Sequence, residues 1–281
     1  MIPAWFQPAA AIVLVLAYAL SLRAHPGRAL ECLAIAVGAW AGEESCIRLY
    51  GFYSYSPDWW PFVSRVPLLI VAIWPMIVES ARDVASELWP GATRLGHAAL
   101  VAVVVTVDAS LMEVVATANG LWSWAEPGYL GVPLIGILGW VFFAAPLAFG
   151  LEGSGRRPLR AIAWSLGSVL VTHALLIGAW WGGLRWVLRG DLGPRAVAGF
   201  APLAAGLLVL VLRSGRGLRV STILARVAAA SMFFALLART RTMPLVAHVA
   251  LVAVPYIVAS ARSLRSGRQA PPFADEKLGA A

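Results

Sequence analysis

The chain carries few charged residues for its length. Asp, Glu, Lys and Arg make up 13% of its 281 residues, about half the share found in a soluble domain. Hydrophobic residues make up 60%, and the mean hydropathy is +0.78. A single water-soluble core cannot bury so many apolar side chains, so the chain requires lipid as its solvent. This composition excludes a soluble enzyme, a disordered scaffold and a secreted disulfide-bonded module.

Residues that bind metals or cofactors are scarce as well. The two cysteines, Cys32 and Cys46, lie in one apolar segment without metal-ligand spacing, and the four histidines are scattered. The sequence has no aspartate-rich pair for a Mg²⁺-diphosphate and no glycine fingerprint for a dinucleotide. We therefore expect no metal ion and no cofactor, so that any chemistry depends on carboxylates and aromatic side chains.

Long apolar runs dominate the rest of the sequence. A helix crosses the hydrocarbon core in about 20 residues and satisfies its own backbone hydrogen bonds. The pattern predicts an all-α integral membrane protein with one transmembrane domain over residues 1–262 and a disordered tail over residues 263–281. About nine transmembrane helices are expected, at residues 5–22, 29–50, 62–84, 95–118, 130–150, 160–182, 195–213, 220–239 and 244–261.

The basic residues lie in the short breaks between these runs. The net charge of +8 therefore indicates orientation in a membrane rather than binding to nucleic acid. Fourteen Lys and Arg residues fall in the odd-numbered loops and the tail, and seven fall on the opposite side. The positive-inside rule places the N-terminus outside and the C-terminus in the cytoplasm of a multi-pass protein of the inner (cytoplasmic) membrane. The first run lacks a basic start and a cleavage site, so we expect an uncleaved helix.

Two segments of the chain share one pattern, which predicts a parallel internal repeat of two helical hairpins (helices 2–3 and 4–5). In each copy a Glu precedes a Gly by seven residues, two aromatic residues follow at Gly+2 and Gly+4, and a Val-Pro-Leu leads to a Trp. The first copy, residues 40–75, contains Glu44, Gly51, Tyr53, Tyr55, Pro67 and Trp74. The second copy, residues 108–141, contains Glu113, Gly120, Trp122, Trp124, Pro133 and Trp140. The i and i+2 spacing indicates extended segments with both rings on one side, which suit either an interfacial aromatic belt or a shared pocket.

The acidic residues within the apolar runs are candidate functional groups, because carboxylates in a bilayer are costly. Glu44 has Arg48 one turn later, a pairing that can be purely structural. Asp108 and Glu113 have no local basic partner. Two readings are open for them: a protonated acid that donates its proton, or a pair with an arginine distant in sequence.

A further acidic stripe follows in the third apolar run. Glu79, Asp83 and Glu87 recur at every fourth residue beside Arg82. A solvated helix face near the cytoplasmic end accounts for this spacing.

The stretch from Asp108 to Trp140 resembles the integral-membrane carotenoid biosynthesis family. That family includes the bisanhydrobacterioruberin (carotenoid C-1′,2′) hydratases and is distantly related to the membrane lycopene cyclases. The shared pattern is an Asp, an acidic residue five positions later, Gly-x-Trp-x-Trp, Tyr-x-Gly-Val-Pro and a Gly-Trp, and the resemblance covers residues 40–145. This chain departs from it at Val114 and Gly136, where the family commonly has Pro and Asn.

The resemblance implies an enzyme that protonates a terminal C=C bond of a polyene. Water then captures the carbocation (a hydratase), or a neighbouring alkene closes a ring (a cyclase), with no cofactor. Glu113 or Asp108 would be the acid, and Glu44 would orient water or act as the base. The substrate would contact Tyr53, Tyr55, Trp74, Trp122, Trp124, Tyr129 and Trp140.

Other classes of membrane protein fit the same residues. Paired carboxylates also occur in proton-coupled transporters and lipid-binding membrane proteins, and the chain could be a structural partner of another enzyme. The expected partners are an apolar polyene or isoprenoid from the bilayer and membrane lipid, with no nucleic acid. Small residues at 228–231 permit close helix packing within one protomer or in a homo-oligomer.

Overall fold

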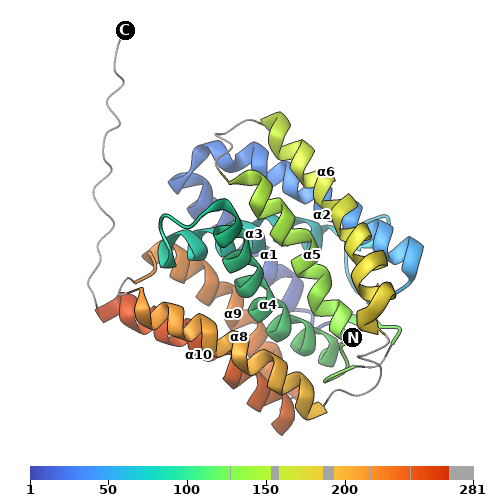
Figure 1. The fold of residues 1–281 in the computed structure, drawn as a ribbon. Coiled ribbons are helices and arrows are strands. Elements are labelled where there is room, and N and C mark those ends of the chain that lie inside the picture. The colour runs from blue at the N-terminus through green and yellow to red at the C-terminus, as the bar shows by residue number, and fades with distance from the viewer. Residues whose placement is uncertain (127, 153–157, 186–192, 215–216, 241, 266–281) are drawn as a thin grey trace.

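The computed structural model describes residues 1–126, 128–152, 158–185, 193–214, 217–240 and 242–265. Within these ranges nine long helices form one bundle (Figure 1). They are α1 (Phe6–Ala24), α2 (Ala29–Tyr50), α3 (Leu68–Leu88), α4 (Arg94–Ala118), α5 (Leu134–Leu151), α6 (Pro158–Leu175), α8 (Gly193–Arg213), α9 (Val220–Thr240) and α10 (Met243–Arg265). A 3₁₀ turn, η1 (Pro26–Arg28), precedes α2, and α6 continues into a π-helical segment, η2 (Leu176–Leu184).

Glycine follows the ends of α2 and α4, and proline precedes the starts of α3 and α5. Gly51 follows α2 with φ +61°, and Gly120 follows α4 with φ +69°, a left-handed conformation that glycine adopts at little cost. After each of these glycines comes a short strand, and then Pro67 or Pro133, in extended conformation, immediately precedes the next helix. The two hairpins α2–α3 and α4–α5 are thus interrupted in the same way.

Two small sheets lie in the loops between these helices. Strand β1 (Tyr53–Tyr55) pairs antiparallel with β4 (Trp122–Trp124), although the two are far apart in sequence. Strands β2 (Phe62–Val63) and β3 (Val66–Pro67) form a local hairpin. The prediction of a helix over residues 62–84 was therefore wrong at its start, because residues 62–67 are extended and α3 begins only at Leu68.

The bundle is built around α4, which packs against α3, α5, α8, α9 and α10. Most of the α4 side chains between His97 and Ala116 are buried. The beginning of α1 and the end of α10 lie at opposite ends of the bundle (Figure 1). Helix α10 ends at Arg265, three residues beyond the expected boundary at 262, and residues 266–281 of the expected tail lie outside the described part of the chain.

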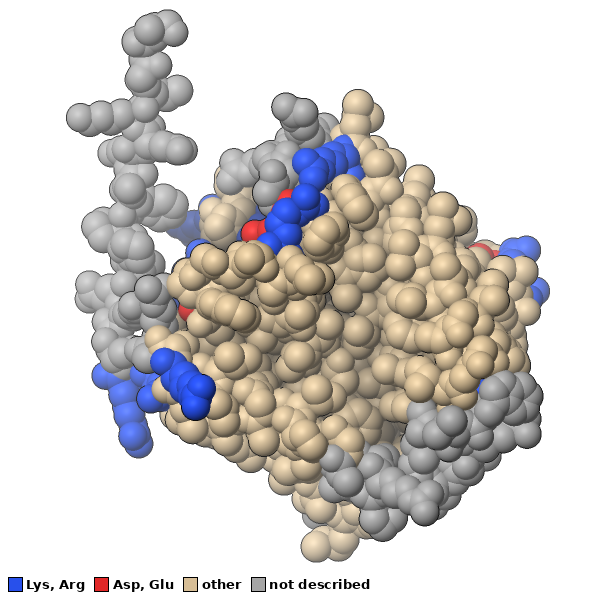
Figure 2. Space-filling view, viewed as in Figure 1, with Lys and Arg blue, Asp and Glu red and all other residues tan. Residues whose placement is uncertain are grey.

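The outer surface of the bundle is apolar. Figure 2 shows a face whose centre carries no charged side chains, with Lys and Arg gathered toward its edges. Among the described residues, six helices are long and apolar enough to cross a membrane: Phe6–Ala24, Arg94–Ala118, Leu134–Leu151, Leu159–Leu184, Val220–Thr240 and Met243–Arg265. The chain is therefore an all-α, multi-pass membrane protein.

Helices α2 and α3 carry more charge than these six, and much of it is buried in one ion-pair network. Arg28 contacts Glu79 at 3.1 Å and Asp83 at 2.8 Å, while Arg82 contacts Glu31 at 2.7 Å and Glu79 at 2.6 Å. Glu79 is only 1% exposed. The interpretation of this stripe as a solvated face was thus wrong for Glu79, because arginines from two elements enclose it.

This network predicts that one arginine has a large effect on stability. Replacing Arg82 with Gln leaves Glu79 and Glu31 with less positive charge around them, and breaking a buried pair costs about 3–5 kcal/mol. Arg48→Gln is the matched control, because the Arg48 side chain is 57% exposed in its pair with Glu44 and exposed pairs contribute about 0–1 kcal/mol. The free energy of unfolding in mixed micelles should fall far more for Arg82→Gln. Equal losses in the two variants would contradict the buried network.

Candidate active site

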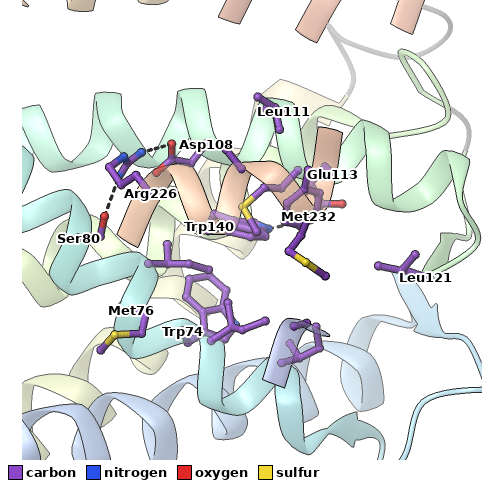
Figure 3. Close-up of a pocket in the computed structure, with 18 of the residues that line it drawn as sticks. Trp74, Met76, Ser80, Asp108, Leu111, Glu113, Leu121, Trp140, Arg226 and Met232 are labelled. Carbon is purple, nitrogen blue, oxygen red and sulfur yellow. Dashed lines mark hydrogen bonds and ion pairs between the residues drawn. The ribbon is translucent and has the colours of Figure 1, made fainter. Parts of the chain in front are cut away.

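The bundle encloses an apolar cavity of about 670 Å³. Side chains from α1, α2, α3, α4, α5, α9 and α10 and from β1 and β4 line it. Figure 3 shows the Asp108–Arg226 pair to the left of Glu113, with Trp140 between them and Trp74 below. The volume falls in the range of small-molecule sites.

Glu113 is held by three indole groups. Its Oε2 accepts hydrogen bonds from Nε1 of Trp122 at 2.8 Å and of Trp124 at 3.2 Å, and its Oε1 accepts one from Nε1 of Trp140 at 2.8 Å. Helix α4 supplies the carboxyl group, β4 supplies two donors and α5 supplies the third. The side chain is 3% exposed, so these bonds replace the water that a surface carboxyl group would bind.

Glu43 has the same environment in the first hairpin. Its Oε2 accepts hydrogen bonds from the phenols of Tyr53 and Tyr55, the latter at 2.9 Å, and its Oε1 accepts one from Nε1 of Trp74 at 2.9 Å. As the spacing predicts, both rings of the extended segment lie on one side. Burial and the nearby Glu43 raise the pKa of both phenols well above the usual range. Both tyrosines therefore stay protonated and act as donors to the carboxyl group.

The two sets of donors contact each other reciprocally. Ring centroids are 4.9 Å apart for Tyr53–Trp124, 5.9 Å for Tyr55–Trp122 and 4.9 Å for Trp74–Trp140. The first aromatic of each strand thus meets the second aromatic of the other strand, while Trp74 meets its own counterpart. Such exchange of partners is what a two-fold relation produces. Its centre in the ribbon is the Ser54–Ser123 pair, whose Oγ atoms are 3.2 Å apart.

The number of donors leaves one acceptor position open on each carboxyl group. A carboxyl group offers about four lone-pair positions, and three are filled in each case, two on Oε2 and one on Oε1. The donors to Glu113 are indole N–H groups, which cannot accept a proton. A proton on the Glu113 carboxyl group therefore has none of these three donors as an acceptor, and Glu113 also lines the cavity.

Three of the predicted site residues differ from what was expected of them. Glu44 does not line the cavity; it is bound by Arg48, by Ser64 Oγ at 2.9 Å and by the backbone N–H of Arg65 at 3.0 Å. Glu43 occupies the position in the cavity that was expected for Glu44. Consecutive residues on a helix point about 100° apart, so only one of the two can face the cavity. The number of residues to Gly51 and the pair with Arg48 do not reveal whether Glu43 or Glu44 faces the cavity.

Asp108 and Tyr129 are the other two. Asp108 lines the cavity but forms an ion pair with Arg226 of α9. Of the two alternatives for Asp108, the structure therefore shows the pair with an arginine distant in sequence. Tyr129 lies outside the cavity lining and packs edge-on against His248 at 5.3 Å. The other predicted aromatic residues line the cavity: Tyr53, Tyr55, Trp74, Trp122, Trp124 and Trp140.

Sequence reasoning missed Glu43, Ser80, Arg226 and Tyr256, all of which line the cavity. Only Glu43 had a signal, since it stands beside Glu44. Among the residues that the structure describes, no three His, Cys, Asp or Glu side chains come together as a metal ion would require.

The pairing of β1 with β4 can be tested by a disulfide. Ser54 and Ser123 lie directly opposite each other, and opposed residues in an antiparallel pair have the Cα separation that a disulfide needs. The variant Ser54→Cys/Ser123→Cys should oxidise to an intramolecular disulfide, seen as a loss of two hydrogens by mass spectrometry. Ser64→Cys/Ser123→Cys, whose residues lie on different ribbons, is the control. Oxidation of the control alone would contradict the register.

Comparison with known proteins does not extend these observations. No protein-family model, curated protein or solved structure matches the chain. The function is therefore argued from the cavity and its side chains.

Proposed function

We propose that this protein is a membrane enzyme of carotenoid or related isoprenoid metabolism, which adds water to a terminal C=C bond of a polyene. The observation that carries the proposal is the pair of carboxyl groups in an apolar cavity, each bound by three aromatic donors and each with one acceptor position open. The resemblance of residues 40–145 to the carotenoid hydratases supports the same reaction.

The two carboxyl groups divide the acid and base roles. Glu113 transfers its proton to the less substituted carbon of the terminal alkene, and the π electrons form the new C–H bond and leave a tertiary carbocation on the other carbon. The oxygen of a water molecule adds to this cation, and the proton released from water passes to Glu43. Because the proton adds to the less substituted carbon of the terminal alkene, the cation lies on the more substituted carbon and the product is a tertiary alcohol. Return of the proton from Glu43 to Glu113 restores the enzyme. Glu43 suits the base role because its phenol donors can relay protons, whereas the indoles around Glu113 cannot.

The aromatic walls stabilise the intermediate. A cation over the face of Trp or Tyr gains about 2 kcal/mol when it is desolvated, and the cavity presents Trp74 and Trp140 (Figure 3). The same rings exclude bulk water, which favours a second candidate reaction. In that reaction a neighbouring alkene of the substrate captures the cation and closes a ring, as in a membrane lycopene cyclase.

The cavity also has a route to the bilayer. Its lining includes Val227 of α9 and Ile257 and Leu264 of α10, which are 52%, 60% and 74% exposed. These side chains lie on the surface that faces lipid, so an apolar chain can enter sideways between α9 and α10. This geometry supports a substrate taken from the membrane.

The same proposal includes a duplicated hairpin and nine membrane crossings. The reciprocal ring contacts and the matching glycine and proline positions support the duplication, with its two-fold axis along the membrane normal. Nine crossings place the two termini on opposite sides, and the excess of basic residues in the odd-numbered loops places the C-terminus in the cytoplasm.

The hydration can be tested in a bacterium that makes lycopene. Expression of the chain should add one water to the pigment, detected by mass spectrometry. Glu113→Gln should lower the yield about 100-fold or more, because the amide cannot supply the proton. Glu44→Gln, outside the cavity, is the matched control and should retain activity. A product isomer of unchanged mass would indicate a cyclase rather than a hydratase. Full activity of Glu113→Gln would refute the assignment of Glu113 as the acid.

The orientation can be tested separately with reporters fused after Ala281. A cytoplasmic C-terminus should give a fluorescent green fluorescent protein fusion and an inactive alkaline phosphatase fusion, since the phosphatase requires the oxidising periplasm to form its disulfides. The reverse pattern would mean an even number of crossings or an inverted protein.

A further inference from the structure

The cavity has a second polar group, formed by Asp108, Arg226, Ser80 and Tyr256, which the proposed hydration does not use. Arg226 pairs with Asp108, donates from Nη1 to Ser80 Oγ at 2.7 Å and lies 4.4 Å from the centre of the Tyr256 ring. All four side chains line the cavity, and Figure 3 shows the pair to the left of Glu113.

We propose that this group is a subsite for a neutral oxygen, a hydroxyl or a carbonyl group, carried by the substrate. A guanidinium group has five N–H donors. In the described structure Ser80 and Asp108 take one each, and the Tyr256 hydroxyl also lies within hydrogen-bonding reach of Arg226 and Asp108. Even with a third donor used by Tyr256, two N–H groups of Arg226 remain for a ligand in the cavity that the side chain lines. A hydroxyl group can accept from Arg226 and donate to Asp108, while a carbonyl group can accept from Arg226.

The charge of the subsite selects a neutral group. Arg226 and Asp108 together carry no net charge, and Asp108 would repel a carboxylate or a phosphate. A buried ion pair is seldom the most stable way to join helices, since apolar residues of similar volume are often as good or better. The position of this pair on an otherwise apolar wall therefore points to recognition of a ligand.

The dimensions place the oxygen on the same molecule as the reacting double bond. Asp108 and Glu113 are five residues apart on α4, which corresponds to a rise of about 7.5 Å. The cavity of about 670 Å³ lies in the range of small-molecule sites. The favoured ligand is an oxygenated isoprenoid chain, or one half of a longer polyene, that contacts both Glu113 and Arg226. The identity of this ligand as a substrate rests on the proposed function, but the subsite itself does not.

Binding to the full chain in nanodiscs tests the subsite without turnover. The probes are retinol, its hydrocarbon analogue with a methyl group in place of the alcohol, and retinoic acid, all at equal mole fraction in the lipid. Binding is followed by quenching of tryptophan fluorescence. Retinol should bind about ten-fold or more tightly than the hydrocarbon, as expected for hydrogen bonds to charged groups, and more tightly than the acid.

The variant Asp108→Leu/Arg226→Met removes both charges together and so leaves no unpaired charge in the cavity. It should keep hydrocarbon binding and lose the preference for retinol. The matched control, Glu44→Gln/Arg48→Gln, alters an ion pair outside the cavity and should keep that preference.

Three results would overturn the subsite. These are equal binding of retinol and hydrocarbon by the unmodified chain, tighter binding of retinoic acid than of retinol, and loss of both neutral ligands in the double variant. The last would make the pair a structural clamp between α9 and α4. A preference for retinol without hydration of any polyene would retain the subsite and refute the proposed function, so the two failures are distinguishable.

Discussion

Two carboxyl groups that line an apolar cavity impose the main constraint on this structure. A carboxyl group taken out of water loses its hydrogen bonds and is costly unless the protein replaces them. Here the replacements are aromatic N–H and O–H groups, three to each side chain of Glu43 and Glu113. To supply them, the chain must leave the helix at Gly51 and Gly120, run extended, and return as a helix that carries a tryptophan. The interruptions of the two hairpins follow from this requirement.

The reciprocal contact of the two hairpins makes the site a shared one. Each donor of one carboxyl group touches a donor of the other, so neither hairpin can shift without disturbing both. Yet the two halves differ chemically, because β1 presents tyrosines where β4 presents tryptophans. Indoles only donate, whereas phenols can also pass a proton on. Two similar sets of contacts thus hold carboxyl groups whose donors differ in their ability to pass a proton on, and the proposed division into acid and base depends on that difference.

The parts of the structure that were predictable from sequence depend on local patterns. Apolar runs indicated the helices, and the glycines, prolines and alternating aromatics indicated the turns and extended segments, because each acts on its own stretch of backbone. The choice between Glu43 and Glu44 depends on the rotation of α2, and the partner of Asp108 lies 118 residues away. Likewise, Glu79 is buried because Arg28 reaches it from before α2. Such contacts between distant segments are set by tertiary packing, which one sequence does not reveal.

The two polar groups of the cavity also differ in how their charge is balanced. Among the described residues, the hydrogen-bond donors to Glu113 are all neutral indole groups. Asp108 instead forms an ion pair with Arg226. In the proposed hydration the first group supplies a proton, while the second offers fixed donors and acceptors. Placed about 7.5 Å apart along one helix, they can act on different parts of one ligand, with α4 setting the distance between recognition and reaction.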